Sequence, residues 1–549
     1  MTILLELDLT GALVEDIGSH PVERVVNRRR LALRTLVNRL ASAAEDPNVV
    51  GLLAKVGGTS ISLAQAQELS EAVTRFQEKG KVAIAWAETF GELGRGTTAY
   101  VVAASFGELW LQPSGSVGLM GATATAMFVR DALDRAEVEP LFAQRHEYKN
   151  AVDTLLRTEF TEAHREATER LAASAYEQIV SAVAVGRQLS EDAVRELIDR
   201  APIPAIEAQQ AGLVDHLGYR DEVRAALDRR WSEKPTLLYV SRYRRRWENL
   251  RRISERRRPG VGLIEAIGTI HTGRSKPGPF ARSTGSDTVA AAFRAAVRDE
   301  HLKAIVFRVN SRGGSYVASD TIWREVCNAS QAGKPVVVSM GDAAGSGGYF
   351  VAVGADVIVA QPATLTGSIG VLGGKLKTSG LFERFGVNLD SLAFGRNALM
   401  FSPQTGFSEE EWAKLDEWLD FVYDDFTSKV ALGRSMTPEA VHEVARGRVW
   451  TGADAAERSL VDELGGLRRA VAIARERAAL PFDAPLRPVP AVSPLQQLRQ
   501  PRNSDDPAAF AQARAWSAQP PEWGGHARLA EALGLTAAGP LTMPIGPLR

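Results

Sequence analysis

Short apolar runs alternate with longer amphipathic stretches along most of this sequence. One run occupies residues 51–56 and another occupies residues 304–309, and a pair of glycines follows each of them. Such runs are typical of buried strands, whereas the longer stretches between them have helical spacing. Strands that alternate with crossover helices build a mainly parallel sheet. The pattern therefore predicts α/β layers.

The same features recur in the same order in two parts of the chain. The matching pairs are residues 80–86 with 333–339, 96–100 with 345–349, 112–113 with 361–362, and 211–218 with 459–466. Self-similarity over such a distance indicates two tandem copies of roughly 200 residues each. We expect a first repeat over residues 1–230, a basic linker over 231–260, a second repeat over 261–480 and a proline-rich tail over 481–549.

Composition narrows the class of protein. The chain has 549 residues, of which 45% are hydrophobic and 24% charged, as in an ordinary globular protein with a large core. Its formal net charge of -1 gives no overall attraction to nucleic acid, so we expect no nucleic-acid partner. The single cysteine, Cys327, excludes an intrachain disulfide and a multi-cysteine metal site, and we expect neither metal nor cofactor.

The location of the protein is predicted from its apolar and basic segments. The amino terminus lacks the basic and apolar regions of a signal peptide, and no run of about 20 apolar residues occurs, so we expect no membrane span. Residues 242–258 carry nine arginines against two glutamates. This basic segment fits a solvated connector, or a peripheral contact with anionic lipid headgroups. We expect a cytoplasmic protein, either free or at the inner membrane face.

The segment with the most chemical content lies in the second repeat. An apolar run from residue 335 ends in glycines around Ser346, and a helix-compatible stretch follows. A serine held in such a turn exposes its hydroxyl, and a substrate carbonyl can approach because the neighbouring glycines lack side chains. The backbone N–H of Gly347 is a candidate oxyanion donor, and the glycine-rich loop 310–315 offers a second.

A serine nucleophile needs a base. Histidine is the usual one, but none of the eight histidines has a recognisable triad context. Lysine can replace it if burial lowers its pKa from about 10.4 toward neutrality. Lys149 is the outstanding candidate, since it begins a helix after the strand-like residues 139–143. Composition alone favours an exposed lysine at this position.

Several motifs together resemble a known family. They are Tyr-Lys-x-Ala-Val at 148–152, Arg-Val-Asn-Ser-x-Gly-Gly-Ser at 308–315, Gly-Lys-Pro-Val-Val-Val-Ser-Met-Gly at 333–341, Ser-Gly-Gly-Tyr at 346–349 and Leu-Thr-Gly-Ser-Ile-Gly at 365–370. Residues 1–480 resemble signal peptide peptidase A in its long, duplicated form, a serine peptidase of family S49 with a Ser/Lys dyad. The resemblance implies two crotonase/Clp-like domains, a homotetramer and unstructured hydrophobic peptides, such as remnant signal peptides, as substrates.

The resemblance also implies a role for individual residues. Ser346 would be the nucleophile, Lys149 the general base, and Ser368 a hydrogen-bond partner of the lysine amine. Gly347 and Gly314 would form the oxyanion hole. The positions implied for substrate binding are Gly313, Ser315 and Gly348.

The two repeats differ at the site. The first repeat has Thr97 where the second has Ser346, so each repeat keeps one half of a site. Two positions depart from the family pattern, because Arg312 replaces the usual proline and Gly345 the usual alanine. The long members also begin with a membrane anchor, whereas this sequence starts almost directly at a strand-like segment. Two alternatives stay open: an inactive scaffold that binds peptides, and an acyl-CoA enzyme of the crotonase type.

Overall fold

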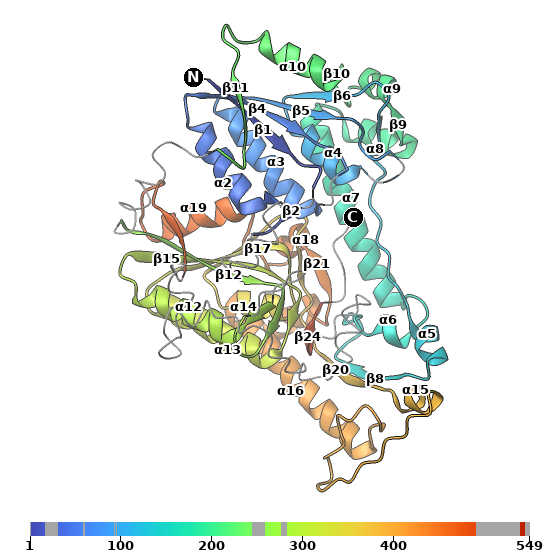
Figure 1. Cartoon of the computed structure of the whole chain (residues 1–549). Coiled ribbons are helices and arrows are strands. Elements are labelled where there is room, and N and C mark those ends of the chain that lie inside the picture. The colour runs from blue at the N-terminus through green and yellow to red at the C-terminus, as the bar shows by residue number, and fades with distance from the viewer. Residues whose placement is uncertain are drawn as a thin grey trace.

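The structure is a computed structural model that describes residues 2–11, 13–16, 31–58, 61–92, 94, 96–243, 258–275, 283–489 and 539–543. Most of the basic segment 242–258 and most of the tail lie outside these ranges. Two α/β units stand one above the other in Figure 1, the first coloured blue to green and the second green to red.

The first unit is built on a six-stranded parallel sheet with the strand order β10-β6-β5-β4-β1-β11. Its strands are β1 (Ile3–Asp8), β4 (Val49–Lys55), β5 (Val82–Ala87), β6 (Glu108–Leu111), β10 (His216–Leu217) and β11 (Thr236–Tyr239). Smaller pairs are β2 (Leu13–Val14) with β3 (Leu31–Ala32), and β7 (Ser116–Val117) with β9 (Ile203–Pro204).

The second unit repeats this order as β22-β18-β17-β15-β12-β23. Its strands are β12 (Gly260–Ile267), β15 (Leu302–Ser311), β17 (Val336–Gly345), β18 (Val357–Ala360), β22 (Glu463–Leu464) and β23 (Leu486–Pro488), with β19 (Leu365–Gly367) and β21 (Val449–Thr451) continuing from the far end of β17. A smaller sheet contains β13 (Thr269–His271), β14 (Ser283–Gly285), β16 (Gly313–Gly314) and β24 (Leu541–Thr542). The predicted tandem α/β repeat is confirmed.

Two edge strands come from segments that the sequence analysis gave to the linker and the tail. Strand β11 pairs in parallel with β1, and β23 pairs in parallel with β12. Each adds a strand beside the first strand of its own sheet.

Helices cover both sheets. In the first unit these are α2 (Leu33–Ala44), α3 (Leu63–Glu78), α4 (Thr97–Ala104), α5 (Arg130–Arg135), α6 (Asp153–Leu156), α7 (Glu162–Arg187), α8 (Glu191–Arg200), α9 (Ala205–Gln210) and α10 (Arg220–Asp228). In the second they are α12 (Ser286–Arg298), α13 (Tyr316–Gln331), α14 (Gly347–Ala352), α15 (Ser379–Arg384), α16 (Glu409–Arg434), α17 (Pro438–Val444), α18 (Gly452–Glu457) and α19 (Leu467–Arg477). Among the helices in the described ranges, none has the length and hydropathy needed to cross a bilayer.

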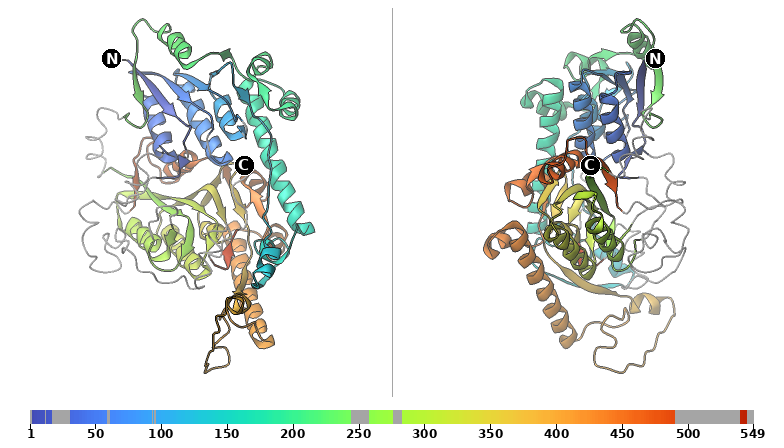
Figure 2. Two further views of the ribbon diagram at one scale, coloured as in Figure 1. Left: turned by 45° about the vertical axis from the view of Figure 1, so that its right-hand side comes forward. Right: turned by 90° about the vertical axis from the view of Figure 1, so that its left-hand side faces the viewer.

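An arm of the first unit joins it to the second. Strand β8 (Glu139–Gln144) pairs antiparallel with β20 (Leu372–Lys377), so a first-repeat strand is hydrogen-bonded to a second-repeat strand. Figures 1 and 2 show this arm, with α5, α6 and the long helix α7, running down beside the second unit. The residues that follow β8 are thereby carried away from their own sheet and held against the second one.

Buried charge also ties the units together. Arg308 on β15 is 2% exposed, and its guanidinium lies 2.6 Å from Glu15 and 2.9 Å from Glu68 of the first repeat. Losing Arg308 would leave two buried carboxylates without their cation, and an unpaired buried charge typically costs about 3–5 kcal/mol. The cluster therefore fixes how the two repeats meet.

Candidate active site

Ser346 lies in a sharp turn between β17 and α14. Its φ of 54° and ψ of -117° are strained for a residue with a side chain. The turn is held by its backbone N–H, which donates to the carbonyl of Gly367 at 2.8 Å. Ser346 is fully buried. The strand-to-helix turn predicted from the sequence is present at this position.

Lys149 reaches Ser346 from the first repeat. It follows β8, in a turn where His146 has a φ of 65° and accepts a hydrogen bond from the Lys149 backbone N–H at 3.3 Å. The Lys149 Nζ atom lies 2.7 Å from Ser346 Oγ although the two residues are 197 positions apart in the chain. It also lies 3.1 Å from both the carbonyl oxygen and the Oγ of Ser368.

The lysine lies in a tightly packed slot. A Cβ atom at Gly447 would lie 2.6 Å from the Lys149 Cα, and one at Gly370 would lie 3.3 Å from the Lys149 Cδ. The φ of Gly447 is 86°, so this position needs glycine for its backbone as well as for space. Sequence reasoning missed Gly447, because a glycine between two arginines carries no local sign of contact with a distant lysine.

Burial governs the charge of the lysine. Lys149 has no exposed surface, and desolvation lowers its pKa well below the usual range. A neutral amine has two N–H donors and one lone pair. The Ser368 carbonyl can only accept, and the Ser368 hydroxyl can accept a second N–H, which leaves the lone pair for the Ser346 hydroxyl. An amine held in this way can take a proton from Ser346.

The predicted oxyanion donors lie side by side. A Cβ atom at Gly347 would lie 3.2 Å from the backbone N of Gly314, so the start of α14 packs directly on β16. Gly313 and Gly314 have φ values of 100° and 149°. Because Gly347 directly follows Ser346, the backbone N of Gly314 lies near the turn that holds the nucleophile.

The remaining predicted residues have packing roles in this structure. The Ser315 hydroxyl accepts a hydrogen bond from the Ala318 N–H at 3.3 Å and caps α13. Gly348 packs on the Ser311 carbonyl, where a Cβ atom would collide. In the first repeat, Thr97 begins α4 and its hydroxyl accepts from the Met120 N–H at 3.1 Å.

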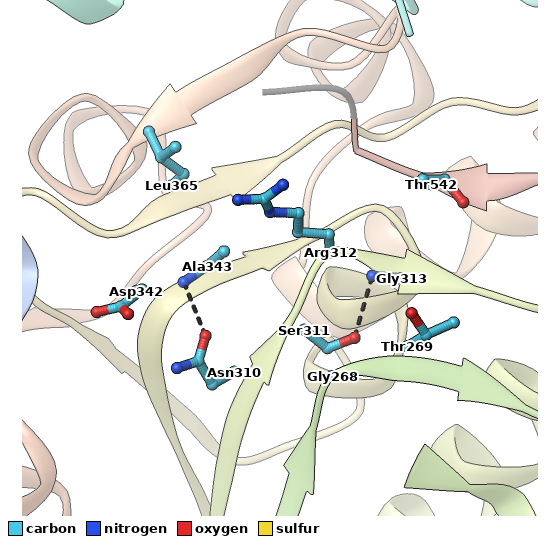
Figure 3. Close-up of a pocket in the computed structure, with 10 residues that line it drawn as sticks. All are labelled: Gly268, Thr269, Asn310, Ser311, Arg312, Gly313, Asp342, Ala343, Leu365 and Thr542. Atoms are coloured by element: carbon cyan, nitrogen blue, oxygen red, sulfur yellow. Dashed lines mark hydrogen bonds between the residues drawn. The ribbon is translucent and has the colours of Figure 1, made fainter. Parts of the chain in front are cut away.

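A cavity of about 230 Å³ opens beside the glycine loop (Figure 3). Asp342 at its edge accepts hydrogen bonds from Ser62 at 2.6 Å and Gln65 at 3.1 Å, and burial raises its pKa to about 6. Burial also lowers the pKa of the Arg312 guanidinium, which stands in the cavity. The lining residues are Gly268, Thr269, Asn310, Ser311, Arg312, Gly313, Asp342, Ala343, Leu365 and Thr542.

Comparison with known proteins identifies the class. The family model "Peptidase family S49" matches residues 75–232 and 328–481, one stretch in each repeat. The chain belongs to this family and is a serine peptidase, which confirms the predicted resemblance.

Among its relatives, "Serine protease SPPA, chloroplastic" from Arabidopsis thaliana is 30% identical over 82% of this chain and 67% of that protein. "Protease 4" from Salmonella typhi is 32% identical over 82% of this chain and 72% of that protein. A solved structure of a ClpP1 mutant from Listeria monocytogenes matches 40% of this chain and 99% of its own, with a TM-score of 0.26 and 13% identity.

Proposed function

We propose that the protein is a serine endopeptidase in which Ser346 is the nucleophile and Lys149 the general base. The observation that carries this proposal is the 2.7 Å separation of the Lys149 Nζ and Ser346 Oγ atoms, with both residues fully buried. Burial favours the neutral amine, which is the form that can accept a proton.

The proposed reaction uses this geometry. Lys149 takes the Ser346 proton while Oγ attacks the carbonyl carbon of a peptide bond. The N–H groups of Gly347 and Gly314 stabilise the negative charge that develops on the carbonyl oxygen. Lys149 next gives its proton to the leaving amine, and an ester joins the acyl part of the substrate to Ser346. Water, deprotonated by the same lysine, hydrolyses this ester.

Ser368 is proposed to position the amine. Its carbonyl and hydroxyl, both at 3.1 Å, hold the two N–H groups of the neutral lysine and thereby aim the lone pair at Ser346. The conformation that brings both oxygens to one point has a φ of 52°, which is unusual for serine.

We propose unstructured hydrophobic peptides, such as remnant signal peptides, as the substrates. Gly313 and Gly314 pair as a strand edge beside the buried Ser346, and such an edge binds a peptide in extended form. Ala343 and Leu365 line the cavity beside the glycine loop and give it an apolar component.

We also propose that the chain forms a homotetramer. The segment between α15 and α16 projects from the lower end of the molecule in Figure 1. It exposes several large apolar side chains, with Leu392 and Phe394 each 95% exposed. Large exposed apolar surfaces are typical of association sites. Light scattering of wild type and Phe394→Asp tests this proposal, because the variant should form smaller assemblies.

Cleavage of an unstructured apolar peptide tests the proposed dyad. Ser346→Ala should lower kcat/KM by at least about 1000-fold, and Lys149→Met by about 100-fold to 10,000-fold, because general-base catalysis is lost. Thr97→Ala is the control, since it removes a hydroxyl at the matching position of the first repeat. Full activity in either of the first two variants would show that the dyad is wrong.

A further inference from the structure

A short piece of the tail lies against the glycine loop of the site. Strand β24 pairs antiparallel with β16, with Thr542 opposite Gly313 and Leu541 opposite Gly314. The Met543 N–H donates to the carbonyl of Arg312 at 2.8 Å. On the other side, the Leu372 N–H of β20 donates to the carbonyl of Pro540 at 3.0 Å. Residues 539–543, called here the tail strand, therefore run between β16 and β20. Figure 1 labels β24 near β20, and Figure 3 shows Thr542 of this segment near the loop that carries Gly313.

The tail strand lies next to the proposed oxyanion donors and to the residue before the nucleophile. A Cβ atom at Gly313 would collide with the carbonyl oxygen of Leu541 and would lie 2.6 Å from the backbone N of Gly347. The Leu541 carbonyl thus lies next to the proposed oxyanion donors. A Cβ atom at Gly345, the residue before the nucleophile, would collide with the Met543 sulfur and lie 3.3 Å from its Cγ. The strand passes Ser346 as an extended peptide would.

The tail strand also has apolar side chains that match its buried position. Leu541 and Met543 are both fully buried, and Leu541 belongs to the same buried apolar cluster as Ile369. The tail strand is itself an uncharged, largely apolar segment, Gly-Pro-Leu-Thr-Met. It therefore has the chemistry of the proposed substrates.

A substrate would need the same contacts. Peptides that bind as an added strand use the backbone groups of a free edge, and here the edges at Gly313–Gly314 and at Leu372 are already paired. Ser346 has no exposed surface in this arrangement. An incoming peptide and the tail strand cannot occupy the groove together.

We propose that the tail strand is an intramolecular inhibitor, which fills the peptide groove of its own chain and leaves before a substrate binds. This inference rests on the proposed function, because the groove matters only if Ser346 is the reacting group. When the tail strand competes with a substrate, the apparent affinity for the substrate is the intrinsic affinity multiplied by the fraction of molecules whose groove is free. If the tail strand occupies about nine-tenths of the molecules, its loss should lower KM about tenfold and leave kcat nearly unchanged.

The first test uses full-length variants and an unstructured apolar peptide substrate. Leu541→Asp places a charge in a fully buried apolar position and should release the tail strand, with a KM about tenfold below that of wild type. Phe482→Asp adds the same charge at a side chain that is 89% exposed and should behave as wild type. An unchanged KM in Leu541→Asp, together with loss of cleavage in Ser346→Ala, would overturn the inhibitor while keeping the dyad. Cleavage by Ser346→Ala would instead overturn the proposed function.

A second test measures hydrogen exchange and does not depend on catalysis by the protein. In Ser346→Ala, the amide of Met543 should be protected from hydrogen exchange by its bond to Arg312. Saturating substrate peptide should remove this protection while the amide of Leu372 stays protected, since the peptide replaces Pro540 as its acceptor. Protection of Met543 that persists while the peptide is bound would show that the groove is elsewhere. A synthetic peptide with the sequence of residues 539–549 should also inhibit Leu541→Asp, and failure to inhibit would count against the proposal.

Discussion

Replacing Lys149 by methionine should separate stability from activity. Methionine is unbranched, of similar length and apolar, so it can fill the slot between Gly447 and Gly370 without a polar group to desolvate. In wild type, burial lowers the lysine pKa in the native state, whereas the unfolded chain has the ordinary value of about 10.4. Between these two values the unfolded state binds one more proton than the native state.

The sign of the pH effect follows from this difference. The contribution of Lys149 to the free energy of unfolding of wild type is lowest at acidic pH. It rises by about 1.4 kcal/mol per pH unit between the lowered native pKa of the lysine and about pH 10. Lys149→Met lacks this slope. The free energy of unfolding of wild type minus that of the variant should therefore increase with pH, and the variant should be the more stable chain at pH 7 while having lost its activity.

Urea unfolding of both full-length chains at pH 7, 8 and 9 provides the measurement. Comparing the two chains at each pH cancels the contributions of the other titrating groups. Lys234→Met, at a side chain that is 78% exposed, is the control for the substitution itself and should follow wild type. A stability difference between wild type and Lys149→Met that stays constant from pH 7 to 9 would refute the reasoning, because it would mean that the buried amine keeps its proton.

Two further predictions concern the surroundings of the site. Gly447→Ala should displace Lys149, because its Cβ would lie 2.6 Å from the Lys149 Cα, and kcat should fall by about 100-fold with little change in KM. Gly386→Ala, with a φ of 70° and open space around it, controls for backbone strain, and equal kcat values for the two variants would contradict the prediction. Asp342 has a native pKa raised to about 6, so its contribution to stability is present below about pH 4 and is lost, by roughly 3 kcal/mol, as the pH rises through 6. Asp342→Asn should abolish this part of the pH dependence of the Tm, whereas a constant Tm difference between the two chains at pH 4 and pH 7 would argue against it.

The repeat and its fold could be predicted because the signal is local. Buried parallel strands such as β4 and β15 contain short uninterrupted apolar runs, and the glycines after them mark turns that only a few residue types allow. The turn at Ser346 was visible for the same reason. These features depend on neighbours in sequence, so the pattern of residues was sufficient to find them.

Features that depend on distant partners could not be predicted from local patterns. The pairing of Lys149 with Ser346 spans 197 positions. Local patterns offered Lys149 only as a candidate base, and the resemblance to a family supplied the pairing. Glu15 and Glu68 gave no sign that they would meet Arg308, because a buried charge cluster looks like any set of surface charges in sequence. The tail strand was missed because two paired residues in a proline-rich segment have no strand pattern of their own. Leu541 and Thr542 form a strand because they pair with Gly313 and Gly314.

Covalent labelling of Ser346 by a small serine-directed phosphonate probe tests the central claim most directly. The rate should be measured in wild type and in Lys149→Met, where any shielding by the tail strand affects both chains alike. The account predicts that wild type is labelled at Ser346, that the rate reaches its plateau at a pH below the ordinary lysine pKa, and that Lys149→Met reacts about 100-fold to 10,000-fold more slowly. Equal labelling rates in the two chains would contradict it.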